Sequence, residues 1–353
     1  MKHNFTAGPA ILPQSVIDNS AAAVKNFNGS GLSLLEVSHR GEDFDAVIEE
    51  ARKSALEIYG LGDDYEALFM TGGASTQFAL VPYNFLNNKA AYLDTGTWAN
   101  KAIKEAQFFG KTEVVGSSKS ENYNHIPKGY TVPSDADYFH ITTNNTIFGT
   151  QIHNIPNVDV PLVADMSSDV YSREIDANKF HLIYAGAQKN LGPSGVTLVL
   201  IRKSWLEQVK RAIPTMFAYK TFVENLSLYN TPPVFPIYVM MESFRWIKEQ
   251  GGLKVIEQYN EEKAALLYNA IDELPLFKGV AAKEDRSLMN ITFVLTKPEL
   301  EKEFLKLTED AQCVGLQGHR SVGGFRASTY NALRKESIQA LVDVMTDFSK
   351  KHG

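Results

Sequence analysis

A lysine, Lys189, lies between two apolar segments in HLIYAGAQKNLGPSGVTLVLIRK, residues 181–203, with glycine, proline and amide residues around it. A lysine at a buried junction of this kind is costly, because burial disfavours the charged ammonium. Burial also lowers the pKa of the amine, and a neutral amine attacks an aldehyde near neutral pH. We therefore predict that Lys189 forms a Schiff base. For a lone lysine in a glycine-rich turn, the alternative is an exposed loop residue.

An aspartate, Asp165, follows the apolar residues of PLVADMSSD, upstream of the lysine. A carboxylate at this point could keep the nitrogen of a pyridine ring protonated, and a protonated ring withdraws electrons. Taken alone, an Asp that ends a strand is more often a cap or turn residue. A strand that ends in Asp, followed by one that ends in Lys, is a more specific combination. Together they favour a site for an aldehyde cofactor with a pyridine ring.

Two further segments could hold such a cofactor. In MTGGASTQF, glycines between a predicted strand and a predicted helix leave N–H groups free for a phosphate, and Ser75 and Thr76 add hydroxyls. Trp98, in DTGTWANKA, could stack on a flat ring. Glycine turns and tryptophans packed in a core are both common, so neither segment is specific by itself.

Arginine and histidine residues could hold an anionic substrate. The candidates are His39 and Arg40 after LEVS, His319 and Arg320 after GLQG, and Arg326 in GGFRAS. The planar guanidinium of arginine fits a carboxylate or a phosphate, and a neighbouring histidine adds a donor. Their glycine- and serine-rich surroundings favour a substrate with two or three negative charges. The alternative is a set of surface salt bridges, which are frequent.

The elements that must position these residues alternate between strands and helices. A helix is predicted over 43–60, ended by Gly60, and another over 76–86. Alternation of this kind favours an α/β domain with a mostly parallel sheet, in which ligands bind at the carboxyl ends of the strands. Strands are predicted within residues 66–70, 90–96, 111–117, 137–145, 161–169, 181–189 and 196–203.

The sequence pattern changes after about residue 236, where long amphipathic helices begin. We predict a large domain from residues 15–250, and a smaller α+β domain from residues 1–14 together with 251–353. The elements expected in this second part are helices at 237–250 and 253–274, a strand at 289–295, a helix at 297–307, a glycine-rich segment, and a final helix with Ile338, Leu341, Met345 and Phe348 on one face.

Composition narrows the class of protein. The 353 residues are 44% hydrophobic and 22% charged, as in soluble globular proteins. The net charge of −6, without a basic stripe, argues against a nucleic-acid partner. No apolar run reaches the roughly 18 residues that a membrane span needs, and no secretory leader is evident, so we expect a cytoplasmic protein without a membrane partner. The single cysteine, Cys313, excludes a Cys-rich metal site, and we expect no metal.

These segments resemble the phosphoserine aminotransferases, a family of class-V, fold-type I aminotransferases. The resemblance covers essentially the whole chain. It implies an α/β large domain with a mostly parallel central sheet, a smaller α+β C-terminal domain, and a homodimer whose active sites lie at the subunit interface. The matching segments are NFTAGPAILP, SHR at 38–40, TGGAS, GTWANKA, NNTIFGTQ, DMSSDVYSREID, AGAQKNLGPSGVT, YNTPP and GHRSVGGFRASTYNA.

The resemblance also implies the cofactor, pyridoxal 5′-phosphate, and the residues around it. Lys189 would form the Schiff base and carry a proton between the substrate and the cofactor. Asp165 would pair with the pyridine nitrogen, and Trp98 would stack on the ring. Thr146 and Gln188 would contact the side of the ring that carries the 3′-hydroxyl. The cofactor phosphate would be bound by Ala74 and Ser75, joined by Asn230 and Thr231 of the partner subunit.

For the substrate, the resemblance implies that Arg326 clamps the α-carboxylate. The distal phosphate or carboxylate would be bound by His39, Arg40, His319 and Arg320. The implied reaction is reversible amino transfer between glutamate and 3-phosphooxypyruvate, as in serine biosynthesis. In some bacteria the family also acts on a phosphorylated hydroxythreonine precursor in pyridoxine synthesis, and the sequence leaves that open here.

Two positions of the chain depart from the pattern of the phosphoserine aminotransferases. Some members carry arginine where this chain has Ser75, and serine often stands where it has Gly41. These departures bear on cofactor affinity and not on the reaction, because neither removes a reacting group.

Two rival functions are compatible with parts of the sequence. A rival within the fold type is another aminotransferase or a cysteine desulfurase, for which Cys313 is the sole candidate nucleophile. A rival of another class is an inactive binding protein, which the presence of Asp165, Lys189 and Arg326 disfavours.

Overall fold

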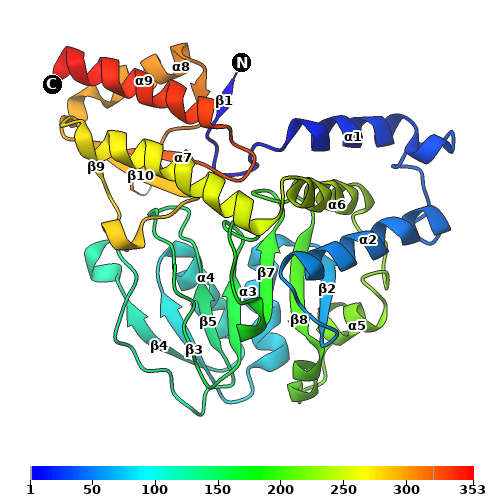
Figure 1. The fold of residues 1–353 in the computed structure, drawn as a ribbon. Helices are drawn as coiled ribbons and strands as arrows, with labels where there is room; N and C mark the ends of the chain where they lie inside the picture. Colours follow the sequence, from blue (N-terminus) through cyan, green and yellow to red (C-terminus); the bar gives the residue numbers. More distant parts are fainter. Residues whose placement is uncertain (1, 321) are drawn as a thin grey trace.

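A seven-stranded sheet forms the centre of the larger part of the molecule, in the strand order β2-β8-β7-β6-β5-β3-β4. The structure, a computed structural model, describes residues 2–320 and 322–353 (Figure 1). The strands are β2 (Tyr65–Met70), β3 (Lys89–Asp94), β4 (Lys111–Ser117), β5 (Phe139–Thr142), β6 (Leu162–Asp165), β7 (Phe180–Gly186) and β8 (Thr197–Arg202).

The sheet is mostly parallel, as the alternation of elements predicted. Strands β3 to β7 pair in parallel, whereas β8 runs antiparallel to both β2 and β7. The reversal at β8 has a simple cause: β7 and β8 are joined directly by residues 187–196 with no crossover helix, and a short connection suits antiparallel neighbours. The central strands are buried along their length, which explains their continuous apolar sequences.

Helices cover both faces of this sheet. Helices α2 (Glu42–Ile58) and α6 (Val234–Glu249) pack against one face, in one cluster of buried apolar residues. Helices α3 (Gly73–Phe85) and α4 (Thr97–Ala106) pack against the other, in a second cluster. Helix α3 begins three residues earlier than the sequence pattern suggested, so Ala74 and Ser75 lie in its first turn. Helices α1 (Gln14–Lys25) and α5 (Tyr219–Glu224) complete this part.

The C-terminal part has a core of its own, to which the N-terminal residues are attached. A three-stranded sheet, in the order β12-β10-β9, packs with helices in a third apolar cluster, and β1 (His3–Asn4) pairs in parallel with β11 (Cys313–Val314). Figure 1 shows α8 and α9, coloured orange to red, on one side of the large sheet. The elements are α7 (Leu253–Glu273), β9 (Phe277–Gly279), β10 (Asn290–Leu295), α8 (Glu301–Asp310), β12 (Phe325–Ser328) and α9 (Lys335–His352).

Helix α7 belongs to both parts. Its first turn contributes Leu253 and Ile256 to the first cluster, and its later turns contribute Leu267 and Ile271 to the third. The domain boundary expected near residue 250 therefore stays a prediction. Short 3-10 helices occur at Phe27–Gly29, Lys119–Glu121, Ala177–Lys179, Lys203–Gln208, Thr215–Phe217, Lys283–Asp285 and Pro298–Leu300. In the part of the chain that the structure describes, no helix has the length and apolarity needed to cross a membrane.

The two parts of the molecule pack tightly at Gly149, whose backbone lies against Thr292 and Asn290 of β10. A Cβ atom there would clash with Thr292 Oγ1 and lie 2.9 Å from the carbonyl oxygen of Asn290, and the backbone φ is +79°. We expect Gly149→Ala to lower the free energy of unfolding by about 2–4 kcal/mol, from the left-handed backbone and the overpacking together. Thermal or urea denaturation measures the loss.

Gly129→Ala is the matched control for this substitution. Gly129 has a similar φ of +72°, yet a Cβ there would meet no atom within 4 Å. The free energy of unfolding of Gly129→Ala should therefore fall only by the cost of the left-handed backbone, about 1–2 kcal/mol. Equal losses in the two variants would show that the contact at Gly149 is not tight.

Candidate active site

The amine of Lys189 is buried where the large sheet ends. The residue lies in the turn between β7 and β8 and is 9% exposed. Its Nζ donates hydrogen bonds to Thr146 Oγ1 at 2.9 Å and to Ser168 Oγ at 2.7 Å. Burial lowers the pKa of this amine to about 8, against the opposing influence of the Asp165 carboxylate, and the Arg326 guanidinium lowers it further. The neutral amine is therefore available at a much lower pH than in an exposed lysine.

The carboxylate of Asp165 lies at the carboxyl end of the neighbouring strand β6. It is 4% exposed, and its Oδ1 accepts a hydrogen bond from the backbone N–H of Ser167 at 2.9 Å. Burial raises the pKa of Asp165, whereas the hydrogen bonds from Ser167 and the charge of Lys189 lower it. Strands β5, β6 and β7 are parallel, so their ends meet at one edge of the sheet, and this edge brings Asp165 near the lysine.

A cavity of about 170 Å³ adjoins these two groups. It brings together seven of the residues that sequence analysis assigned to the cofactor: Ala74, Ser75, Trp98, Thr146, Asp165, Gln188 and Lys189. Five further residues line it that the sequence analysis did not assign: Gly73, Thr142, Asn144, Ser167 and Ser168. The run of polar residues directly after β6 was the available signal for Ser167 and Ser168.

The cavity lacks partners for some of its own polar atoms. Trp98 Nε1 and Thr142 Oγ1 are buried and make no hydrogen bond with any residue that the structure describes. Helix α3 begins at Gly73, and a Cβ on this glycine would meet no atom within 4 Å, so space is open at the first turn. A helix N-terminus with open space suits an anion. A flat ring that carries a phosphate, an aldehyde and a basic nitrogen fits this set of groups.

A guanidinium, that of Arg326, stands over the same site from strand β12. Its NH1 donates to the carbonyl oxygen of Thr146 at 3.2 Å, and its Nε is buried without a hydrogen-bond partner. Among the described residues it forms no ion pair with an acid, and burial lowers its pKa. Arg326 is half-buried, and a partly desolvated cation without a counter-charge is costly, so this geometry favours an anionic ligand.

More positive charge gathers around Arg326. The pKa of His319 is lowered by its burial and by the nearby charges of Arg326, Arg320 and Lys101. Arg320 is exposed, and Lys101 Nζ lies 4.5 Å from the centre of the Trp98 ring. Sequence analysis did not assign Lys101, because a lysine on a helix, three residues after a tryptophan, has no distinctive pattern. Three of the residues expected at the substrate, His319, Arg320 and Arg326, therefore lie near one another.

Of the expected residues, seven line the cavity and seven do not; His319, Arg320 and Arg326 lie beside it, and four others remain. Asn230 and Thr231 are exposed, as is Arg40, and His39 is half-buried with its Nε2 unpartnered. Their roles stay predictions. Of the two departures, Ser75 lines the cavity, and Gly41 precedes α2 with extended backbone.

A larger hollow lies elsewhere, at about 720 Å³, and is lined by segments within 126–134 and 152–160 and by Glu284 and Asp285. It does not contain Lys189. Size alone would have selected this hollow, but buried groups with displaced pKa values are the better guide to chemistry. We therefore place the candidate active site at the smaller cavity.

The sequence profile of the class-V aminotransferases matches residues 3–341 of the chain. The chain therefore belongs to this family.

Within the family, the chain is similar to several phosphoserine aminotransferases. The chain is 57% identical to the phosphoserine aminotransferase of Flavobacterium johnsoniae and 56% identical to that of Bacteroides fragilis, over 99% of both chains in each case. The solved phosphoserine aminotransferase of Bacillus circulans subsp. alkalophilus superposes with a TM-score of 0.97 at 48% identity, over 100% of this chain and 99% of that one. A structure from Trichomonas vaginalis, described as bound to PLP, gives 0.93 at 37% identity, over 98% and 100%. These matches place the chain among the phosphoserine aminotransferases.

The displaced pKa of Lys189 gives a prediction that needs no substrate. A small water-soluble aldehyde, trapped by reduction with borohydride, should label residue 189 of the cofactor-free protein with a midpoint near pH 8. Labelling should rise with pH, because only the neutral amine reacts and the lowered pKa makes it neutral earlier. Peptide mapping across a pH series measures the midpoint. Absence of label from residue 189 at pH 8–9, while surface lysines react, would contradict the assignment.

Proposed function

We propose that this site transfers an amino group reversibly between glutamate and 3-phosphooxypyruvate, with formation of O-phospho-L-serine and 2-oxoglutarate. One observation carries the proposal. Thr146 contacts both the amine and the guanidinium, since its Oγ1 accepts from Lys189 and its carbonyl oxygen accepts from Arg326. The reactive amine lines the cavity, and one residue of the cavity wall, Thr146, joins it to a guanidinium that has no ion-pair partner among the described residues. The phosphoserine aminotransferases that the chain resembles over its whole length support this reaction.

Pyridoxal 5′-phosphate fits the cavity as the cofactor. When bound, it supplies an aldehyde and an electron-withdrawing pyridine ring. Asp165 would hold a proton on the ring nitrogen, and Trp98 would stack on the ring and find a partner for its Nε1. Thr146 and Gln188 would lie along its edge. The first turn of α3, with Ala74 and Ser75, would receive the phosphate.

Lys189 would move the proton in this reaction. Its lowered pKa makes Nζ a competent base near neutral pH, and its nitrogen would take the proton from the substrate α-carbon and later return it. Thr146 and Ser168 orient the amine through two hydrogen bonds. Because Lys189 and Asp165 are both buried, bulk water is kept away from the reacting atoms.

The positive charges would recognise both substrates. Glutamate and 3-phosphooxypyruvate each carry a carboxylate beside the reacting carbon, and Arg326 would bind it in either case. His319 and Arg320 would bind the distal group, together with His39 and Arg40. A guanidinium pairs with a carboxylate or a phosphate, which allows one site to accept both compounds.

We also propose a homodimer in the cytoplasm. Asn230 and Thr231 lie outside their own chain's cavity, as expected if they serve the site of the partner subunit. Large apolar side chains are exposed near them, which suits a surface that a second copy covers: Met216, Phe217, Leu226 and Tyr229 are 39–46% exposed. Two-fold dimers are the commonest closed assemblies. The single cysteine, buried and reduced, suits a reducing compartment.

The desulfurase alternative is not supported by the position of Cys313. The residue lies in strand β11, is 1% exposed, and burial raises the pKa of its thiol to about 11. A persulfide-forming cysteine must instead be mobile and readily deprotonated. Another aminotransferase specificity is the remaining alternative, and a choice of acceptors distinguishes it.

An amino-transfer assay tests the proposal. With glutamate as donor, we expect turnover with 3-phosphooxypyruvate to exceed that with pyruvate or oxaloacetate. Pyruvate has no distal anion, and a phosphate carries more negative charge toward the distal cations than the carboxylate of oxaloacetate does. Lys189→Ala should reduce kcat by at least about 10²–10⁴-fold, since the proton carrier is lost. Its circular dichroism should stay that of the wild type. Preference for an unphosphorylated acceptor would reject the proposed substrate.

Substitution of the arginines should separate the two ends of the substrate. Arg326→Leu should lower kcat/KM for both glutamate and 3-phosphooxypyruvate by about 2–4 kcal/mol, or roughly 30- to 1,000-fold, because both carry the α-carboxylate. The double variant His319→Ala with Arg320→Ala should instead raise KM more for 3-phosphooxypyruvate than for pyruvate. Steady-state kinetics measure both. A loss confined to one substrate in Arg326→Leu would show that this residue is not the shared clamp.

A further inference from the structure

Residues 143–152, the first part of the connection between β5 and β6 and here called the loop, link the reactive amine to the Arg326 guanidinium. Its residue Thr146 receives a hydrogen bond from Lys189 through the side chain and one from Arg326 through the backbone. Movement of this loop would therefore change the position of one group relative to the other. The question is what holds the loop.

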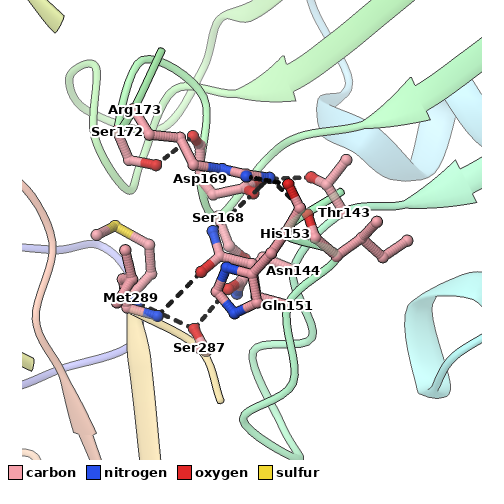
Figure 2. Close-up of polar contacts among 12 residues, drawn as sticks. Thr143, Asn144, Gln151, His153, Ser168, Asp169, Ser172, Arg173, Ser287 and Met289 are labelled. Atoms are coloured by element: carbon pink, nitrogen blue, oxygen red, sulfur yellow. Dashed lines mark hydrogen bonds and ion pairs between the residues drawn. The ribbon is translucent and has the colours of Figure 1, made fainter. Parts of the chain in front are cut away.

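Asp169 holds the loop at both ends, as Figure 2 shows. Its Oδ1 accepts a hydrogen bond from Thr143 Oγ1 at 2.5 Å, and its Oδ2 accepts one from Gln151 Nε2 at 3.1 Å. Arg173 lies beside it, with NH2 at 3.9 Å from Oδ2, and donates to the carbonyl oxygens of Ile152 and His153 at 2.5 and 2.7 Å. Each oxygen of one carboxylate thus fastens one end of the loop.

The same loop is joined to strand β10 of the C-terminal part. Gln151 Oε1 accepts from the N–H of Leu288 at 3.0 Å. Asn144 Oδ1 accepts from Ser287 Oγ at 2.5 Å, as Figure 2 shows. Asn144 Nδ2 donates to Asn290 Oδ1 at 2.7 Å. In the antiparallel pair of β10 with β12, Arg326 stands opposite Thr292. The hydrogen bonds therefore run from Asp169 through the loop to the strand that carries the guanidinium.

We propose that Asp169 is a positioning residue for the reaction, whose carboxylate fixes residues 143–152 and thereby sets the separation between the Lys189 amine and the Arg326 guanidinium. The inference rests on the proposed amino transfer. A carboxylate suits this task because it only accepts hydrogen bonds, whereas an amide would turn N–H groups toward one of its two donors. Its 4% exposure makes the charge costly to bury, and the contacts offset that cost.

The charge of Asp169 also acts on the amine directly. A carboxylate favours the protonated form of the Lys189 nitrogen, so it raises the pKa that burial lowers. Other charged groups also influence the pKa of Lys189, and a substitution at Asp169 leaves them unchanged. The titratable and charged groups around Asp169 are Arg173, Lys189, Asp165, Tyr59, Tyr330 and His153, with Arg326 beyond the lysine.

The test is Asp169→Asn in the holoenzyme, which keeps the size of the side chain. We expect kcat/KM for glutamate and for 3-phosphooxypyruvate to fall together by about 10- to 100-fold, with KM raised for both, because the clamp is displaced from the amine. The pH midpoint of the visible absorbance of bound pyridoxal phosphate should shift to lower pH, because a charge that favours the protonated nitrogen is lost. A purely structural residue would not move that midpoint.

Glu66→Gln is the matched control. Glu66 lies on the edge strand β2, away from the cavity, and is 7% exposed. Its two carboxylate oxygens accept hydrogen bonds from Nε and NH2 of Arg52 at 2.9 and 2.7 Å. It should lose thermal stability without a change in KM or in the absorbance midpoint. If both KM values and the midpoint of Asp169→Asn equal those of Glu66→Gln, the proposal is overturned.

Two further measurements keep the outcomes separate. Should Asp169→Asn fail to fold, Thr143→Val keeps the shape of the side chain and removes the 2.5 Å hydrogen bond to Asp169, together with a weaker one at 3.2 Å to the carbonyl oxygen of Asp165. An unchanged KM for both substrates in that variant also overturns the proposal. The absorbance titration needs no substrate. It therefore still tests Asp169 if the wild type proves inactive with 3-phosphooxypyruvate, a result that would instead reject the proposed function.

Discussion

Burial of one primary amine constrains the rest of this structure. An ammonium loses much of its hydration when it is enclosed, and only well-placed acceptors and nearby carboxylates make its position tolerable. Lys189 finds the hydroxyls of Thr146 and Ser168, with Asp165 and Asp169 near enough to favour its charge. These partners come from separate connections, and they meet because parallel strands end at the same edge of the sheet.

The positive charges around the amine outnumber the negative ones, which favours anionic ligands. Lys189, Arg173 and Arg326 supply three cations when the lysine is protonated, against the two carboxylates of Asp165 and Asp169. An excess of positive charge in a region of low dielectric attracts anions strongly. The cofactor phosphate and dicarboxylate or phosphorylated substrates would each supply negative charge. The site is therefore electrostatically more complete with its ligands than without them.

The site also depends on both cores. The amine and the ring-facing carboxylate belong to the large sheet, whereas the guanidinium belongs to β12 of the C-terminal part. Polar side chains join the two parts at residues 143–152 and β10, and they are buried and hydrogen-bonded to one another. Hydrogen bonds of this kind are directional, so they fix a register that apolar packing alone would leave less defined.

The sequence alone determined the chemistry and the fold class. Lysine and aspartate at the ends of successive apolar strands predict Lys189 and Asp165, since strand ends in an α/β sheet converge by geometry. The glycine-rich turn and the tryptophan after another strand indicated Ser75 and Trp98, and the resemblance of ordered motifs added Thr146, Gln188 and Ala74. All five line the cavity.

Only the tertiary structure decided which groups touch across the chain. Lys101 has no distinctive sequence pattern, and the polar run after β6 does not show which of its side chains meets the amine or the loop. Ser168, Lys101 and Asp169 each acquire a role from a neighbour in another segment. The reversed direction of β8 likewise followed from the short connection that carries Lys189. Periodicity and motifs describe one segment at a time, whereas burial, pairing and electrostatic coupling exist only between segments that the fold brings together.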